Sequence, residues 1–222
     1  MPGKTKQLAT SKPAVIAPPD YWEKACADLM KQDRILRKII PKYTQVEFLA
    51  TRGDPFQTLA RAIVGQQISV KAAQAVWDRV VATQKKFTAA NILKTEPTLF
   101  REAGMSARKV EYLRDLANHF QNGGLGHANW DQLDDETVIK ELVAIRGIGR
   151  WTAEMFLMFH LRRPNVLPLD DLGLIKGISL AYFSGEPVSR SEAKEVAANW
   201  EPWRTVATWY MWRSIDPIPV EY

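Results

Sequence analysis

Apolar side chains recur along most of this chain at the spacing of an α-helix. The clearest case is the stripe at i, i+3, i+4, i+7 and i+8 formed by Phe56, Leu59, Ala60, Ile63 and Val64. Asp54 and Pro55 precede it as a cap and a proline at the first helical position. No convincing alternating pattern typical of a strand follows Asp20, so the predicted fold class is all-α.

Other segments repeat this pattern and carry helix boundary signals. Gly104 and the pair Gly123-Gly124 are predicted to end two helices that begin near Thr95 and Ala107. Ser189 and Glu192 suggest a capping box for a helix that runs to Trp200, and Pro202 is expected to open the last one. Apolar faces are expected at Tyr21, Trp22, Ala25, Leu29, Val110, Leu113, Leu116, Ala117, Phe120, Trp203, Ala207, Tyr210 and Met211.

The domain organisation follows from these segments. Residues 1–19 hold three lysines and four prolines and read as a disordered basic tail. Residues 20–222 are expected to form one domain of two helical lobes with a cleft between them. No internal repeat of solenoid period is found.

Composition changes this picture little. The 222 residues are 46% hydrophobic and 25% charged, which is typical of a globular protein, and the net charge of +5 mildly favours a polyanionic partner. No run of apolar residues is long enough for a membrane span and no signal core begins the chain, so we expect a cytoplasmic protein. The single cysteine, Cys26, excludes an internal disulfide and a four-cysteine iron–sulfur cluster, and is expected to be a buried thiol.

One segment points to chemistry. In LVAIRGIGRWTAEMFLMF, residues 142–159, an apolar helix ends at Gly147-Ile148-Gly149 and a second helix begins at once. The unpaired N–H groups of its first turn form an anion site, and glycine lets a phosphate come close to the backbone. A short Gly-x-Gly between helices is often only a tight turn, so the site depends on what surrounds it.

An acidic pair, Asp170-Asp171, follows this hairpin by about twenty residues. An aspartate at a helix start most often caps the helix. Capping and catalysis are compatible, because backbone N–H groups that bind a carboxylate hold it in place and favour its charged form.

Together the hairpin, Arg150-Trp151-Thr152-Ala153 and the downstream acidic pair resemble the helix-hairpin-helix DNA glycosylase superfamily, and specifically the 3-methyladenine DNA glycosylase II family. The resemblance covers roughly residues 50–215. It implies a DNA repair enzyme that flips an alkylated purine out of double-stranded DNA and hydrolyses its N-glycosidic bond. Gly147, Gly149 and Thr152 would then bind the DNA backbone.

The resemblance places the catalytic carboxylate at Asp171, with Asp170 as a neighbour that could be the cap; the adjacent acidic residues leave a one-residue ambiguity. A fixed carboxylate stabilises the positive charge that develops on the sugar. An alkylated purine needs no protonation to leave, which agrees with the absence of a histidine near Asp171: His119, His127 and His160 read as surface or packing residues.

Eight tryptophans provide candidates for stacking on the flipped base. The resemblance implies that Trp151 and Trp212 line the base pocket, whereas the default is that tryptophan is core, as expected for Trp22, Trp77, Trp130, Trp200 and Trp209. Relatives that also cut the strand carry a nucleophilic lysine at the position of Trp151, so this chain is expected to lack lyase activity. Lys176 would contact the DNA backbone.

Residues Gly65-Gln66-Gln67-Ile68-Ser69 match a loop that fills the gap left by the flipped base. Gln67 falls at the gap-filling position, with Gln66 and Ser69 beside it, where some relatives have an apolar wedge. The alternative is a plain polar helix end that satisfies nearby backbone groups.

Further implications concern the pocket and the hairpin. Met155 and Leu172 stand where some relatives have aromatic pocket residues. The backbone carbonyls of Val143, Ile145 and Ile148 would bind a monovalent cation, Na⁺ or K⁺, and no other cofactor is expected. The N-terminal β-containing domain of some relatives is not expected, because fewer than 50 residues precede the matching region.

The leading hypothesis is therefore a monomeric, monofunctional DNA glycosylase of base excision repair, located in the cytoplasm with the nucleoid or in a nucleus. One alternative is a helix-hairpin-helix module that binds DNA without chemistry. Another is a glycosylase of the same fold for oxidised or mismatched bases, against which the absent lysine and cluster cysteines count.

Overall fold

The computed structural model describes residues 18–43, 54–123, 125 and 129–216. These residues form helices and contain no strand, which confirms the all-α prediction. The predicted tail lies almost wholly outside the described residues. Along the described part, no helix is both long and apolar enough to cross a membrane.

The helices follow one another with short connections. Their bounds are α1 (Trp22–Gln32), α2 (Leu36–Ile39), η1 (Ile40–Lys42), α3 (Pro55–Gly65), α4 (Val70–Ala82), α5 (Ala89–Lys94), α6 (Pro97–Glu102), α7 (Ala107–Asn122), η3 (Trp130–Gln132), α8 (Asp135–Val143), α9 (Arg150–Phe159), α10 (Leu172–Tyr182), α11 (Arg190–Ala198) and α12 (Arg204–Ile215).

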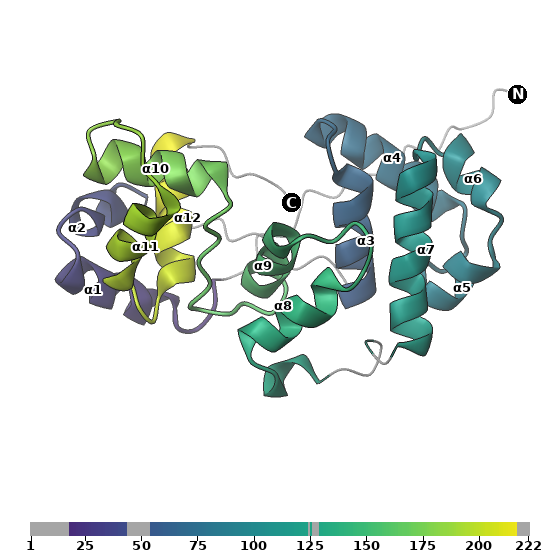
Figure 1. Ribbon diagram of the computed structural model, residues 1–222, viewed down its shortest axis with the longest axis horizontal. Helices are drawn as coiled ribbons and strands as arrows, with labels where there is room; N and C mark the ends of the chain where they lie inside the picture. The colour runs from purple at the N-terminus through teal and green to yellow at the C-terminus, as the bar shows by residue number, and fades with distance from the viewer. Residues whose placement is uncertain (1–17, 44–53, 124, 126–128, 217–222) are drawn as a thin grey trace, which may run out of the picture.

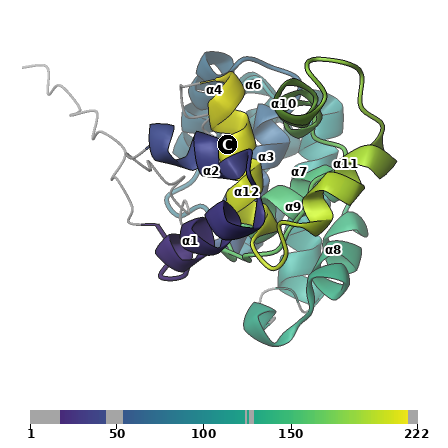
Figure 2. The same cartoon turned by 90° about the vertical axis from the view of Figure 1, so that its left-hand side faces the viewer.

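Two hydrophobic cores divide the described residues into two lobes (Figure 1). The first core is built by α3–α9. The second joins α1 and α2 to α10–α12, so the first and the last described helices share one lobe, and the turned view shows α1, α2 and α12 side by side (Figure 2). Trp212 of α12 packs on the first core, which makes α12 a link between the lobes.

Most predicted boundaries are confirmed by cap geometry. The Asp54 carboxylate accepts the N–H of Gln57 ahead of α3, whose predicted apolar stripe is fully buried. Ser189 and Glu192 form both bonds of the capping box. The chain ends α11 at Ala198, two residues before Trp200, and starts α12 at Arg204, two residues after Pro202.

A buried carboxylate fixes the base of the second lobe. Asp33 caps α2 through Oδ1, which accepts the N–H groups of Ile35 and Leu36 at 2.7 and 3.0 Å. Its Oδ2 accepts the hydroxyl of Tyr182 at 2.7 Å and the indole N–H of Trp200 at 3.3 Å. Helices from opposite ends of the chain are therefore joined by one charged group with a full set of donors.

Cys26 and two of the three histidines lie within the described residues. Cys26 is half-buried rather than buried, with its sulfur 3.4 Å from the Tyr210 hydroxyl, and burial raises the pKa of the thiol. His160 stacks on Phe156 and contacts Thr58, while His119 contacts the carbonyl of Asp115, so both are packing residues. His127 lies outside the described residues.

Candidate active site

The hairpin between α8 and α9 has the conformation of an anion site. After Val143 the chain turns tightly, with the N–H of Ile145 donating to Leu142 and that of Ile148 donating to Ile145. Gly149 is the N-cap of α9 and provides no side-chain cap. The N–H groups of the first turn of α9, where the half-exposed Thr152 lies, are therefore available to a phosphate.

The two glycines of this turn differ in what a side chain would meet at each position. Gly147 has φ +86°, and a Cβ there would lie 2.2 Å from the ring of Tyr112, so packing and conformation both require glycine. A Cβ at Gly149 would meet nothing within 4 Å. Gly149 therefore faces open space, which is what close approach of a ligand to the backbone requires.

Asp171 is the N-cap of α10, and its side chain is held by three N–H donors. Oδ1 accepts the backbone N–H of Leu174 at 2.7 Å and the indole N–H of Trp212 at 2.8 Å. Oδ2 accepts the indole N–H of Trp151 at 2.8 Å. These donors come from α10, α12 and α9, so the carboxylate lies where the two lobes meet.

Asp171 is linked to the start of α9 through Trp151. Trp151, its hydrogen-bond partner, is only two residues beyond Gly149. Asp171 is 7% exposed, so only a group that enters the site can reach it. A carboxylate has about four acceptor sites, and three are occupied, which leaves one on Oδ2.

The structure distinguishes the two acidic neighbours. Asp171 is the cap, so the suggestion that Asp170 caps the helix is wrong. Asp170 is half-exposed and pairs with Arg190 of α11 at 2.8 Å. Among the two, only Asp171 is buried and held by several donors.

Trp151 and Trp212 both reach Asp171 with the edge of the ring. Trp212 is buried and stacks on Phe159, with 5.9 Å between ring centroids. Trp151 is partly buried against the first core. Trp22, Trp130, Trp200 and Trp209 are core residues as predicted, and Trp77 packs at the edge of the first core.

The other residues predicted for the base pocket and the backbone differ in exposure. Met155 is buried within the first core. Leu172, next to the buried Asp171, is 84% exposed. Lys176 is exposed one turn further along α10. Of these three, Leu172 is the one that a molecule approaching Asp171 would meet.

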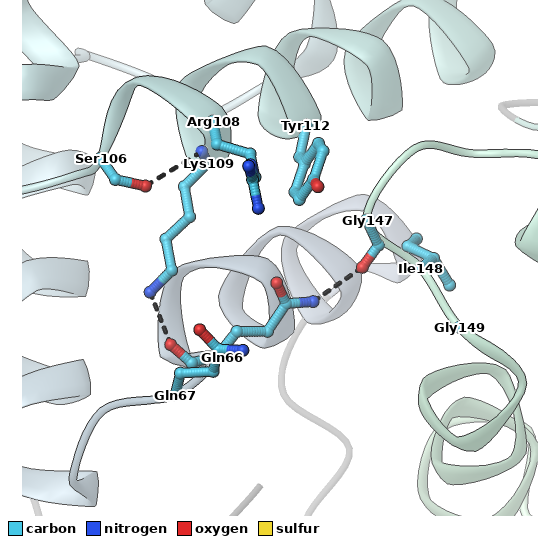
Figure 3. A pocket seen from close by; sticks show the side chains of 9 residues that line it. All are labelled: Gln66, Gln67, Ser106, Arg108, Lys109, Tyr112, Gly147, Ile148 and Gly149. Atoms are coloured by element: carbon cyan, nitrogen blue, oxygen red, sulfur yellow. Dashed lines mark hydrogen bonds between the residues drawn. The ribbon is translucent and has the colours of Figure 1, made fainter.

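A cavity of about 430 Å³ borders the hairpin (Figure 3). It lies within the first lobe and does not include Asp171. The predicted inter-lobe cleft stays a prediction. The lining residues are Gln66, Gln67, Ser106, Arg108, Lys109, Tyr112, Gly147, Ile148 and Gly149.

The sequence of the loop after α3 allowed two interpretations, a gap-filling loop or a plain polar helix end, and features of both are present. The Gln66 side chain donates to the carbonyl of Gly147 at 2.7 Å, as a polar residue at a helix end would. Gln67 is exposed and has φ +57°, a left-handed conformation unusual for a residue with a side chain. Ser69 caps α4 by accepting the N–H of Ala72.

Sequence reasoning missed Arg108, Lys109 and Glu154. The first two follow the Ser106 cap of α7, and a pair of basic residues at a helix start, where the dipole disfavours them, was the available signal. Glu154 is 4% exposed; Oε1 accepts Arg150 Nε at 3.0 Å, and Oε2 has no hydrogen-bond partner. The pKa of Glu154 is raised to about 7, mainly by burial; Arg150 opposes the shift, and Asp170 and Glu136 add to it.

The all-α fold, the glycine hairpin and the buried, indole-bound aspartate agree with the DNA glycosylase class that the sequence predicts. Residues 60–204 match the model of the HhH-GPD superfamily base excision DNA repair protein family. The chain belongs to this superfamily.

Relatives and solved structures agree with this. DNA-3-methyladenine glycosylase 1 of Schizosaccharomyces pombe is 32% identical over 165 residues, which is 72% of each chain. The DNA-3-methyladenine glycosidase of Bacillus halodurans has a TM-score of 0.80 at 36% identity, covering 86% of this chain and 89% of the other. The S. pombe 3-methyladenine DNA glycosylase in complex with abasic DNA has a TM-score of 0.72 at 30% identity, covering 86% and 96%. The protein is a DNA glycosylase of base excision repair, and DNA is its partner.

Proposed function

We propose that this protein hydrolyses the N-glycosidic bond of alkylated purines, such as 3-methyladenine, in double-stranded DNA, with Asp171 as the catalytic carboxylate. The observation that carries the proposal is the set of three N–H donors that hold the Asp171 side chain beside the hairpin. The names of the relatives support the substrate class.

Asp171 acts on the sugar. As the bond between C1′ and the base breaks, its electron pair leaves with the base and positive charge develops on the deoxyribose. A buried carboxylate held by fixed donors stabilises that charge without reorganising. A water molecule hydrogen-bonded to the remaining acceptor site of Oδ2 adds to C1′ and gives its proton to that oxygen, from which the proton passes to solvent, leaving a free base and an abasic site.

No general acid is required for this substrate class. An alkylated purine carries positive charge and becomes neutral as it leaves. The two described histidines, His119 and His160, are engaged elsewhere in the fold. The site thus favours charged leaving groups over undamaged bases.

The presence of Trp151 also argues against strand cutting by a lysine nucleophile. In strand-cutting relatives a lysine at this position attacks the sugar as an amine, whereas an indole has no nucleophilic amine. Its N–H is committed to Asp171. Water is therefore the nucleophile, and the strand stays intact.

The flipped base would contact the two tryptophans whose edges contact Asp171. Trp212 is buried and stacks on Phe159, so it would contact the base or its sugar mainly with the ring edge that faces Asp171. A cationic purine gains cation–π attraction from an indole face. Leu172, exposed beside Asp171, would contact the base or its sugar, with Met155 supporting the pocket from the core.

The hairpin binds the DNA backbone in this proposal. The N–H groups of Gly149 and the first turn of α9, with Thr152, would bind a phosphate, and Lys176 another. Gln67 would fill the space left by the base. The carbonyls of Val143, Ile145 and Ile148 suit Na⁺ or K⁺, since each carbonyl has two lone pairs and the Ile145 oxygen uses one for Ile148.

The decisive experiment compares Asp171→Asn with Asp170→Asn on a panel of duplexes that each contain one alkylated base. The first variant should release no measurable base yet bind the duplex at least as tightly, because a negative charge near phosphates is removed. The second should keep activity within about threefold, as an exposed ion pair contributes little. Equal loss in both, or an active Asp171→Asn variant, would refute the assignment. The same proposal places the protein with genomic DNA, as a monomer.

A further inference from the structure

Lys109 of α7 reaches across to the end of α3. Its ammonium donates to the carbonyl of Val64 at 2.8 Å and to that of Gln66 at 2.7 Å (Figure 3). The last carbonyls of a helix lack partners within the helix, and a cation is favoured there by the helix dipole. Lys109 therefore closes the C-terminus of α3 from a different element.

Gln67 directly follows the Gln66 carbonyl that Lys109 binds, and its backbone conformation is unfavourable. Gln67 has φ +57°, which is unfavourable for a residue with a side chain and persists only where the surroundings impose it. Lys109 binds the carbonyl immediately before Gln67, at Gln66. Gln67 itself is exposed, followed by the exposed apolar side chains of Ile68 and Val70.

A second bond ties the loop to the hairpin. The Gln66 side chain donates to the carbonyl of Gly147 at 2.7 Å, so the loop that carries Gln67 is hydrogen-bonded directly to the hairpin. The Lys109 ammonium has carbonyl oxygens as its hydrogen-bond partners and no carboxylate partner among the described residues. The Lys109 ammonium therefore stabilises the loop through these bonds. Burial lowers the pKa of its amine.

We propose that Lys109 is a positioning residue that holds Gln67 in the conformation in which it enters the DNA stack. The inference rests on the proposed function, because it assumes that Gln67 fills the gap left by a flipped base. Lys109 then lowers the cost of base flipping without contacting the base. Lys109 therefore affects the removal of a damaged base that is stacked and paired in a duplex. It does not affect the removal of a base that is already unstacked.

The test is Lys109→Met, which keeps the aliphatic stem and removes the ammonium. On a duplex with one alkylated base we expect kcat/KM to fall by about tenfold or more, the scale of losing one charged hydrogen bond. On a single-stranded oligonucleotide with the same lesion it should change by less than about twofold. Lys194→Met, which removes an exposed charge from α11, is the control and should change neither rate.

Two further measurements keep the outcome decisive. With 2-aminopurine beside an uncleavable lesion analogue in a duplex, Lys109→Met should bind but give a smaller fluorescence increase. In the Gln67→Ala background, Lys109→Met should have little additional effect, since both act on one step. An equal loss on duplex and single strand, or additive effects of the two substitutions, would show a merely structural role for Lys109. If wild-type protein is inactive on every lesion, the proposed function fails instead.

Discussion

The indole nitrogen of Trp151 lies 2.8 Å from Oδ2 of Asp171, and this bond connects the start of α9, directly after the glycine hairpin, to the carboxylate. Trp151 belongs to the first turn of α9, and Asp171 begins α10 in the other lobe. A phosphate bound at the hairpin and a sugar at Asp171 are thereby kept in a fixed relationship. In the absence of this bond the carboxylate would retain its cap and its bond to Trp212 but lose its alignment with the hairpin.

The first prediction tests that bond. Trp151→Phe keeps an aromatic ring and removes the N–H, so single-turnover base release should slow by about 10- to 100-fold while DNA affinity changes little. Trp203→Phe is the matched control, because it removes another indole bond to an aspartate, Asp28 at 3.0 Å, far from the hairpin. Similar losses of activity in both variants would contradict a role specific to Asp171.

The second prediction concerns the product. Because water is the nucleophile, a damaged strand incubated with the enzyme should run uncut on a denaturing gel until it is treated with alkali. Borohydride should trap no covalent complex, since no amine attacks the sugar. Cleavage in the absence of alkali, or a trapped complex, would show that a lysine elsewhere takes the place held by Trp151.

The third prediction separates the hairpin glycines. Gly147→Ala should lower the free energy of unfolding by about 2 kcal/mol or more, because the Cβ meets Tyr112 and φ is positive. Gly149→Ala should leave stability nearly unchanged and weaken DNA binding, since its Cβ would occupy the open space used by the phosphate. Urea unfolding and fluorescence anisotropy measure the two effects; the reverse pattern would contradict the assignment.

The fourth prediction is a pH dependence of stability that originates at Glu154. Its pKa rises from 4.5 to about 7 on folding, mainly because of burial, so the folded state binds the proton more tightly. Between about pH 4.5 and pH 7 the unfolded chain ionises first, and the free energy of unfolding falls as the pH rises. The loss is at most on the order of 3 kcal/mol, at 1.4 kcal/mol per unit.

Glu154→Gln should remove this dependence, because the amide oxygen still accepts Arg150 and cannot ionise. The variant should be more stable than wild type at pH 8 and similar at pH 4.5, measured by urea unfolding. Glu195→Gln on the exposed side of α11 serves as the control. An unchanged pH slope in Glu154→Gln would place the responsible group elsewhere.

Much of the fold could be predicted because its signals are local. The stripe of α3, the Asp54 cap and the Ser189 capping box depend on residues within a few positions of one another. The predicted end of α11 and the predicted start of α12 each differ from the structure by two residues. The apolar pattern of α11 continues to Trp200, although the helix ends at Ala198.

The site was predictable only in part. The hairpin and Asp171 followed from motif and resemblance. The edge-on contacts of Trp151 and Trp212 did not, because an indole in a pattern shows neither which edge it presents nor to what. Asp33 illustrates the difficulty: it caps a helix and accepts aromatic donors just as Asp171 does, yet it lies at the base of a lobe, away from the hairpin.

By itself the sequence determined the all-α class, most helix boundaries, the glycine turn and the acidic pair ahead of α10, because spacing, caps and glycines act over short stretches of chain. Tertiary structure alone decided which groups meet: two indoles on Asp171, a lysine from α7 on the end of α3, and a half-satisfied Glu154 in the core. The indole bonds to Asp171 and the Lys109 bond to the end of α3 join residues 20 to 45 positions apart, and only the packing of the helices brings them together.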